Sequence, residues 1–563
     1  MLYPRQPQLP LGLHEKLPIG EDKWKALIFL KGNASMFWNR LFRKQSGWKK
    51  RQPQEQQPQG QQDIPLQRVS KSLHANFSFI RELFGDSSDI KINEFYFGKN
   101  RERKGALIYL DGLVNPQSIT QSILKPLRSF TETALDSMEQ IEKKVLCAAN
   151  ANEYESLSEL IGSCLCGDTI FLAEGFDRGL LIGTRGWEQR SITEPETEVV
   201  VHGPREGFTE NLLINTMLLR RRIKSPRLRL EQLVIGQKTR TKVCIAYIEG
   251  VAGTQLIAAV KRRLAAIDVD AILDSGYLEQ YIEDAPYSIF GTVGNTEKPD
   301  VATAKMLEGR VVIISDGSPF ALTVPYLFVE SFQNAEDYYV CYLFASIIRQ
   351  LRYLSFFITI FAPAWYIALT TFHQELIPTT LLFTIAKASR GIPFPAFTET
   401  LILFVTFEIV REAGLRLPRP VGQAVSIVGA LVLGEAAINA GFVGAPGVIV
   451  LAITAVSSFV VPEKYATAAI LRMLAMIGAG ILGGFGITVI FLGILIHLAT
   501  LKSFGVPFFE GFTPSTDLKD SFIRLPLWLM ARRPKDIAQG DHRRSRVFIP
   551  PLRPYAEAED DDI

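Results

Sequence analysis

The chain has 563 residues, with 61 Lys and Arg against 58 Asp and Glu and a formal net charge of +3. This length exceeds one ordinary domain of about 150 residues. Charged residues become sparse after residue 350, so the net charge averages two unlike parts and is a poor guide to partners. We expect no nucleic-acid partner. The composition indicates a multi-domain protein, with a soluble mixed α/β N-terminal region followed by an α-helical polytopic transmembrane domain.

Cysteine and histidine usage argues against several kinds of site. Five cysteines without paired spacing do not suit a disulfide framework and favour a reducing compartment. Cys164 and Cys166 are close, but Cys-x-Cys without a second pair or a nearby His cluster is a weak metal signal. The six histidines are scattered and no Ser-His-Asp pattern emerges. We therefore expect no metal, no cofactor and no catalytic residues, so that the chain is not an enzyme.

Residues 1–69 are predicted to form an N-terminal extension. It carries the run RQPQEQQPQGQQ, which has no large apolar side chain and cannot bury enough surface to offset the entropy of ordering. The run is therefore predicted to be a flexible tether. The first apolar run, at residues 26–30, is shorter than the roughly 7–15 residues of a signal-peptide core, so we expect membrane insertion to depend on later segments.

Residues 70–350 have the alternating pattern of a soluble α/β region, with a helix-like window at 118–138. The predicted strands, each closed by a Gly or Asp turn, are GALIYLDG from Gly105, DTIFLAEG from Asp168, RGLLIGTRG from Arg178, KVCIAYIEG from Lys242 and GRVVIISDG from Gly309. We predict two cytoplasmic subdomains, at residues 70–235 and 236–350, divided near Gly236.

Apolar stretches dominate residues 351–505, the predicted transmembrane helical domain. Residues 354–371 hold eighteen positions without a charge, close to the roughly 20 that a spanning helix requires. Shorter apolar pieces at 376–386 and 397–409 are separated by prolines, which predicts a broken or re-entrant element that crosses once.

Two further apolar blocks complete this domain. Residues 421–442 and 447–461 are joined by a Gly-Pro turn and are predicted to form a hairpin. Residues 465–500 are long for one span and short for two, and their glycines permit either a kink or a tight re-entry.

The distribution of basic residues predicts the orientation of these spans. Arg349 and Arg352 immediately precede the first span, and an Arg-rich stretch lies in the basic tail at 506–563. Because Lys and Arg favour the cytoplasmic side, both ends of the chain are predicted to lie there. An even number of crossings, four or six, satisfies this arrangement.

Acidic side chains within the apolar blocks are candidates for a pore. Glu435 lies inside the block 421–442, where an acidic side chain costs roughly 2.5–3.5 kcal/mol, so it should face protein or water. A protonated carboxyl in an interhelical hydrogen bond, or a local contact with Asn439 one turn away, explains it equally well. Glu408 is a second pore candidate, since a ring of such carboxylates attracts cations. For Glu399 and Glu412, which flank it, a wet face of an interfacial helix is the simpler interpretation.

Arg205 is the candidate partner contact in the soluble region. It lies between Gly203 and Gly207 after a predicted strand, so an exposed turn is able to present it to a partner or an anion. A salt bridge to Glu206 or Glu210 is the commoner outcome. The run Arg220, Arg221 and Arg222 is interpreted as solvating a helix.

Longer motifs resemble the A subunits of GerA-type spore germination receptors. The matching stretches are ETEVVVHGPREGFTENLLINTMLLRRRI from Glu196, YIEGVAG from Tyr247, SDGSPFALTVPYLFVESFQNAEDYY from Ser315, PRPVGQAVSIVGALVLGEAAINAG from Pro418 and LKDSFIRLPLWLMARRP from Leu518. The likeness extends over nearly all of the chain after the tether.

The resemblance implies a role in nutrient sensing in the inner spore membrane, in contact with membrane lipid. Family A subunits are thought to assemble with a permease-like B subunit that binds the germinant and with a C-type lipoprotein. They are also thought to form a homo-oligomeric ring that passes ions. Two alternatives stay open: an accessory spore-membrane protein supporting ion or dipicolinate release, and a membrane transporter that uses its intramembrane carboxylates.

Overall fold

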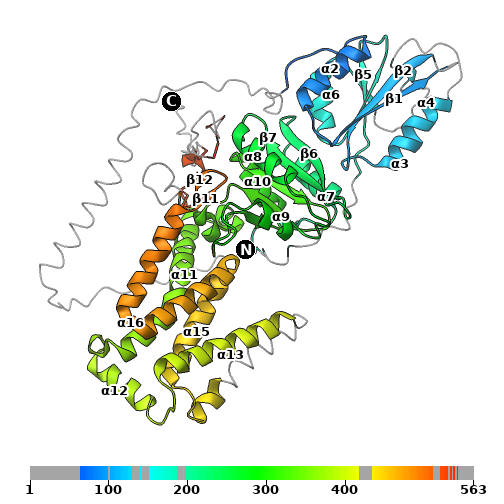
Figure 1. Cartoon of the computed structure of the whole chain (residues 1–563). Coiled ribbons are helices and arrows are strands. Elements are labelled where there is room, and N and C mark those ends of the chain that lie inside the picture. The colour runs from blue at the N-terminus through cyan, green and yellow to red at the C-terminus, as the bar shows by residue number, and fades with distance from the viewer. Residues whose placement is uncertain are drawn as a thin grey trace, which may run out of the picture. The chain divides into compact units, whose positions relative to one another are not determined.

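The computed structural model describes residues 64–98, 102–129, 138, 140–141, 151–186, 195, 198, 200–416, 434–510 and 520–530, with six positions from 533 to 542. The predicted tether lies outside the described residues. So do most of the predicted block 421–442 and most of the basic tail. Figure 1 labels the elements that the following paragraphs name.

The first sheet has five antiparallel strands in the order β1-β2-β4-β5-β3. Its strands are β1 (Ile90–Phe97), β2 (Arg103–Leu110), β3 (Ala151–Tyr154), β4 (Thr169–Ala173) and β5 (Gly179–Ile182). Side chains alternate along β2, so Ala106 and Ile108 face one core and Leu107 faces the other. The strands predicted from Gly105, Asp168 and Arg178 are confirmed.

Helices cover both faces of this sheet (Figure 1). On one face lie α2 (Leu73–Phe84) and α6 (Leu157–Cys164). On the other lies a continuous helical stretch made of α3 (Pro116–Ser118), η4 (Ile119–Leu124) and α4 (Lys125–Ser129). The helix predicted at 118–138 is therefore found as far as Ser129, beyond which most of the window lies outside the described residues.

The second sheet has the order β6-β7-β9-β10-β8. Its strands are β6 (Leu228–Ile235), β7 (Thr241–Ile248), β8 (Gly294–Thr296), β9 (Val311–Ser315) and β10 (Ala321–Val324). One face packs against α7 (Leu212–Arg222) and α10 (Pro299–Leu307), and the other against α8 (Thr254–Ala265) and α9 (Ser275–Ile282). The strands predicted from Lys242 and Gly309 are confirmed.

The division predicted near Gly236 is wrong. Gly236 adopts φ +91°, in the turn that joins β6 to β7, and the two strands pair from Ile235–Thr241 to Leu228–Ile248. A glycine that supplies a left-handed turn inside a hairpin looks in sequence like a glycine between domains. The boundary between the two sheets lies before β6.

Arg220, in the last turn of α7, connects the two sheets. Its side chain is 1% exposed and donates to Asp89, immediately before β1, with Nε 2.8 Å from Oδ2 and Nη2 3.1 Å from Oδ1. It also donates to the backbone carbonyls of Ser225 and Leu228. The interpretation of Arg220 as a solvated residue is therefore wrong, because a run of three arginines spans nearly a full helical turn and one of them faces inward.

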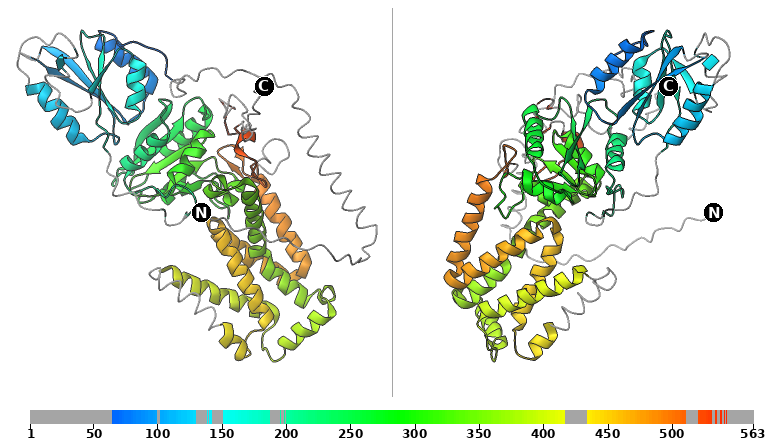
Figure 2. Two further views of the ribbon diagram at one scale, coloured as in Figure 1. Left: turned by 180° about the vertical axis from the view of Figure 1, so that it is seen from behind. Right: turned by 45° about the vertical axis from the view of Figure 1, so that its right-hand side comes forward.

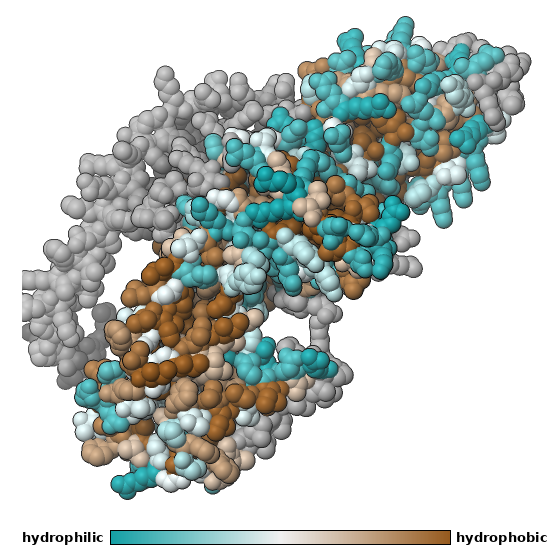
Figure 3. All heavy atoms as spheres, viewed as in Figure 1, coloured by the Kyte–Doolittle hydropathy of each residue, from teal (hydrophilic) through white to brown (hydrophobic). Residues whose placement is uncertain are grey.

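The C-terminal half of the described chain is helical. It contains α11 (Tyr342–Thr371), α12 (Thr379–Ala388), α13 (Ala396–Arg416), α15 (Ala445–Val460) and α16 (Tyr465–Thr500). Among the described residues, two helices are long and apolar enough to cross a membrane by length and composition, α11 and the helical stretch Pro462–Thr500. Apolar side chains gather on the surface of this region, whereas polar ones prevail over the sheets (Figure 3). A mixed α/β region followed by a helical region is the predicted fold class, and it is confirmed.

Helix α16 is broken at Gly483. This residue has φ 60° and ψ −137°, and the two halves of α16 meet there at an angle (Figures 1 and 2). The backbone N–H of Gly484, which the break frees, donates to His373 Nε2 at 3.1 Å. A broken helix in an apolar setting needs such a partner. Of the two options for residues 465–500, the structure has the tight re-entry, because Thr467 and His497, one in each half of α16, hydrogen-bond to the adjacent residues Ile289 and Ser288. The number of crossings stays a prediction.

Substituting Gly483→Ala is expected to lower the free energy of unfolding by about 1–3 kcal/mol, because Ala rarely adopts this backbone conformation. Its Cβ would also lie 2.9 Å from the Phe372 Cβ. Gly493→Ala is the matched control in the same helix, since nothing lies within 4 Å of a Cβ there; it should be neutral or stabilising. Thermal unfolding of the purified chain in detergent measures both, and equal midpoints would refute the role of Gly483.

Candidate functional site: a charged junction at the start of α11

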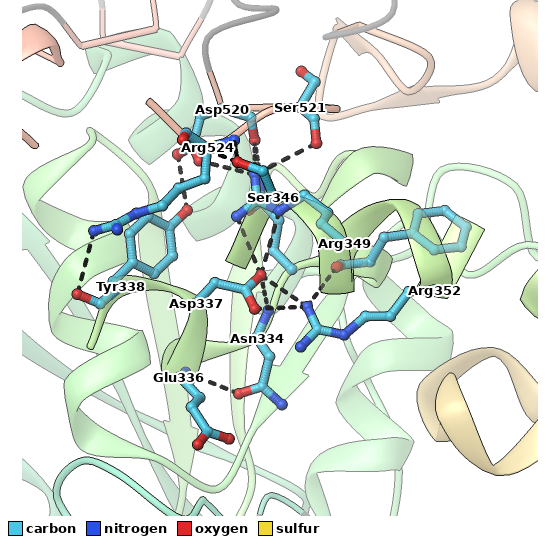
Figure 4. Close-up of polar contacts among 12 residues, drawn as sticks. Asn334, Glu336, Asp337, Tyr338, Ser346, Arg349, Arg352, Asp520, Ser521 and Arg524 are labelled. Carbon is cyan, nitrogen blue, oxygen red and sulfur yellow. Dashed lines mark hydrogen bonds and ion pairs between the residues drawn. The ribbon is translucent and has the colours of Figure 1, made fainter. Parts of the chain in front are cut away.

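A cluster of buried charges joins the sheet region, the first apolar helix and the C-terminal segment (Figure 4). We call it the junction, and it consists of Asp337, Arg349, Arg352, Asp520 and Arg524. Asp337 lies in η6 (Ala335–Tyr338), and the first two arginines lie on α11. The other two residues belong to the described segment 520–530.

Arg349 is at the centre of the junction and is 0% exposed. Its Nε and Nη2 donate to Asp337 Oδ2 at 3.3 and 3.2 Å, and its Nη1 donates to Asp520 Oδ1 at 3.0 Å. Arg352 lies about one helical turn after Arg349 on α11 and donates to both oxygens of Asp337 at 2.8 Å. Two arginines and two carboxylates thus neutralise one another, and Arg349 and Asp337 do so almost entirely out of contact with water.

Segment 520–524 is tied to α11 and η6 by many hydrogen bonds. The Asp520 carboxylate accepts a bond from the Tyr338 hydroxyl at 2.8 Å, and its backbone carbonyl accepts one from Gln333 Nε2 at 2.7 Å. Arg524 donates to the carbonyls of Tyr338 and Val340 at the end of η6. A displacement of α11 along its axis would therefore break contacts to two other parts of the chain.

Burial shifts the pKa of Asp520 in the junction and that of the neighbouring Tyr338. It raises the pKa of Asp520, although Arg349 and the Tyr338 hydrogen bond oppose this shift. It also raises the pKa of Tyr338 well above its ordinary value, so this hydroxyl stays a donor. No nucleophile lies among these groups, and the arrangement is suited to holding elements together.

Glu408, a predicted pore residue, is held in a second ionic cluster between α13 and α16. Its carboxylate accepts bonds from Arg472 at 2.5 Å, Arg411 at 3.1 Å and the Tyr465 hydroxyl at 2.6 Å. Arg472 is 3% exposed, whereas the Glu408 side chain is 32% exposed. These contacts join two apolar helices, and a pore role for Glu408 stays a prediction.

Glu435 and Asn439, the other intramembrane candidates, are exposed on the surface of the single chain. Neither is among the side chains that hydrogen-bond to Glu408 in the described part of the chain. Glu399 is buried and accepts a hydrogen bond from the Gly444 backbone N–H at 2.7 Å, so the wet helical face expected for it is wrong. Glu412 fits that expectation, because it is exposed and pairs with Arg416.

Arg205 is exposed, as its position in a turn predicts. Glu206, one of the partners expected for Arg205, pairs with Arg221 and Arg222. Glu206 therefore helps to hold the end of α7. The partner-contact role of Arg205 stays a prediction. Among the described residues, no group of three or more His, Cys, Asp or Glu is placed to hold a metal ion.

Comparison with known proteins agrees with the motifs. The sequence model of the family described as Bacillus/Clostridium GerA spore germination protein matches residues 78–536. The chain belongs to this family. It is 43% identical to spore germination protein KA of Bacillus subtilis (strain 168) over 483 residues, which cover 84% of this chain and 88% of that protein. It is 37% identical to spore germination protein B1 of the same organism over 484 residues, which cover 85% of this chain and 100% of that protein.

Two further relatives are informative. A Bacillus subtilis (strain 168) protein named uncharacterized membrane protein YfkQ is 40% identical over 488 residues, covering 86% of this chain and 94% of that protein. The crystal structure of the N-terminal domain of the A subunit of the Bacillus megaterium spore germinant receptor GerK3 is 33% identical. The match covers 47% of this chain and 98% of that one, with a TM-score of 0.38.

Proposed function

We propose that this chain is the A-type subunit of a nutrient germinant receptor in the inner spore membrane. Its partners would be a permease-like B subunit, a C-type lipoprotein, membrane lipid and further copies of itself in a ring. The ring would pass ions when the germinant binds. Membership of the GerA family supports the receptor role, and the apolar surface of the helical region supports a membrane location.

The junction is the observation that carries this proposal. Helix α11 is 30 residues long, about 45 Å at 1.5 Å per residue, and the junction lies in its first half. Because Arg349 and Arg352 fix the first turns of α11 to η6 and to segment 520–524, the sheet region and the apolar helix move together. A germinant signal that displaces one of them is therefore transmitted to the other, as gating of a channel requires.

Exposure of Glu435 supports a contact beyond the single chain. A carboxylate on an apolar surface is costly in lipid, and that cost is removed by water in a pore or by a neighbouring subunit. Glu408 is a weaker pore candidate, because three donors already occupy its oxygens. Both ends of the chain are proposed to lie on the core side of the membrane.

Replacing Glu435 by Ala tests this function. We expect nutrient-triggered release of K⁺ and dipicolinate to slow by about tenfold or more, with a normal level of the chain and its partners, if the carboxylate lines an ion path. Glu412→Ala is the control, because this carboxylate is also exposed on a helix but already has Arg416 as a partner. Unchanged release would remove Glu435 from the pore, and loss of the protein would make the residue structural.

A further inference from the structure

Three tyrosines on α9 and in the loop after it are exposed. Tyr277 and Tyr281 lie four positions apart on α9 and are 45% and 54% exposed, and Tyr287 in the loop is fully exposed. Residues four apart share one face of a helix. The buried side of α9 packs into the core of the second sheet through Leu278 and Ile282. Scattered exposed apolar side chains are ordinary, so the place of these three in the fold decides what they do.

The loop after α9 is tied to both ends of α16. Ser288, the residue after Tyr287, has its Oγ 2.9 Å from His497 Nε2 in the last turn of α16. The carbonyl of Ile289 accepts a hydrogen bond from Thr467 Oγ1, in the first turn, at 3.0 Å. Because α16 turns back at Gly483, its two ends lie beside each other, and Tyr287 adjoins both.

The same loop lies beside the start of the charge-free stretch of α11. The ring centroid of Phe290 is 5.8 Å from that of Phe328, which is 6.2 Å from that of Phe356. Phe356 is near the beginning of residues 354–371, the stretch without a charge. Residues 287–290 are thus at the level where the two long apolar helices meet the sheet region.

Exposed apolar surface continues from α16 to this loop. Along the second half of α16, Phe485, Leu492 and Ile496 are 67%, 51% and 65% exposed. Ile496 directly precedes His497, the partner of Ser288. A helix surface of this kind suits the acyl chains of lipid, so the loop lies where such a surface ends.

Tyrosine is suited to the boundary between acyl chains and water. Its ring is apolar and its hydroxyl forms hydrogen bonds, and tyrosine is enriched at both surfaces of membranes. The headgroup layer on each side is roughly 5–7 Å thick, so side chains beside the ends of the apolar helices are able to enter it. Nearby acids do not oppose this, because Asp284 pairs with Arg263 and Glu283 accepts the Thr292 backbone N–H at 2.8 Å.

We propose that Tyr277, Tyr281 and Tyr287 anchor α9 in the headgroup layer of a phospholipid membrane, with their rings against the acyl chains and their hydroxyls toward water. This inference rests on the membrane location proposed above. It gives the sheet region a lipid contact of its own, in addition to that of the apolar helices. Since the loop after α9 also holds both ends of α16, the anchor would fix the depth at which α16 enters the membrane.

Tryptophan fluorescence of the purified full chain in phosphatidylcholine vesicles tests the anchor. Tyr287→Trp adds one indole to the six of the chain, and subtracting the wild-type emission isolates it. Phosphatidylcholine with bromine on the upper part of its acyl chains should lower the added emission by about twofold or more, whereas acrylamide in the water should have little effect. Tyr281→Trp should behave in the same way.

Tyr96→Trp is the matched control. Tyr96 is 56% exposed, like Tyr281, but lies on β1 of the first sheet. Its added emission should be lowered by acrylamide and not by brominated lipid. If Tyr287→Trp and Tyr281→Trp respond as this control does, the tyrosines lie in water and the proposal is overturned. Emission protected from both quenchers would mean that protein covers them, such as a second copy of the chain, which also overturns it.

Trp365 distinguishes failure of the anchor from failure of the membrane location. It lies in the charge-free stretch of α11 and is 44% exposed, and the difference between the wild type and Trp365→Phe reports its emission. If brominated lipid quenches Trp365 but not the added indoles, the anchor alone is wrong. If it quenches neither, the proposed membrane location is wrong and the anchor is overturned with it.

Discussion

Arg349→Met is expected to abolish most nutrient-triggered dipicolinate release and to lower the free energy of unfolding by about 3 kcal/mol. Removing one partner of a buried ion pair costs about 3–5 kcal/mol, because the other charge stays buried without compensation. The lower figure applies because Asp520 keeps 27% side-chain exposure and the Tyr338 hydrogen bond, and Asp337 keeps Arg352. Thermal unfolding of the purified chain and release from spores measure the two effects.

The control for Arg349→Met is Arg416→Met. Arg416 is also in an apolar helix, but its pair with Glu412 is exposed and is worth at most about 1 kcal/mol. Adding Asp520→Asn to Arg349→Met should restore part of the stability, since it removes the unpaired charge. If the two single arginine variants lose equal stability, the junction does not hold α11 to the C-terminal segment.

The loss of stability in Arg349→Met should depend on pH. Burial already raises the pKa of Asp520, and Arg349 opposes that rise, so its removal raises the pKa further. The folded variant then binds a proton that the unfolded chain, with an aspartate pKa of about 3.9, does not. Stability of the variant relative to the wild type should therefore recover as the pH falls from neutral toward about 4. Unfolding midpoints at several pH values check this sign.

The pattern of apolar and turn residues alone was sufficient to predict the fold class and half of the strands in the two five-stranded sheets. Strands such as β4 and β9 are short apolar runs that end at Gly or Asp turns, a pattern that indicates a buried strand. The hairpin turn at Gly236 was taken for a boundary because sequence does not show which strands pair. The sequence of residues 465–500 left a kink and a tight re-entry open, since only the contacts of the two halves of α16 with Ser288 and Ile289 decide between them.

The junction was missed for a different reason. Arg349 and Arg352 were counted as basic residues that flank a span, and that rule ignores whether a charge is paired. Their partners Asp337 and Asp520 are separated by more than 180 positions, so no local spacing connects them. A signal was nevertheless present, because each aspartate lies inside a motif quoted for the family likeness, SFQNAEDYY and LKDSFIRLP. An aspartate or glutamate in a motif close to a predicted span is therefore a candidate partner for the arginines that flank the span.

The contact between the two sheets should be equally sensitive to one substitution. Arg220→Met leaves Asp89, which is 7% exposed, without its cation, and we expect a loss of about 3–5 kcal/mol in the free energy of unfolding. Arg221→Met, at the next position, should cost at most about 1 kcal/mol, because it is partly exposed and Glu206 keeps Arg222.

A second substitution separates charge from packing at Arg220. Asp89→Asn keeps an acceptor for the Ser87 hydroxyl, which lies 2.7 Å from Asp89 Oδ1, and removes the buried charge. Combined with Arg220→Met it should therefore recover stability relative to the single variant. Chemical unfolding of the purified chain gives the three values. If the double variant is no more stable than Arg220→Met, the arginine acts through its packing and its bonds to the carbonyls of Ser225 and Leu228, and the ion pair is not what joins the two sheets.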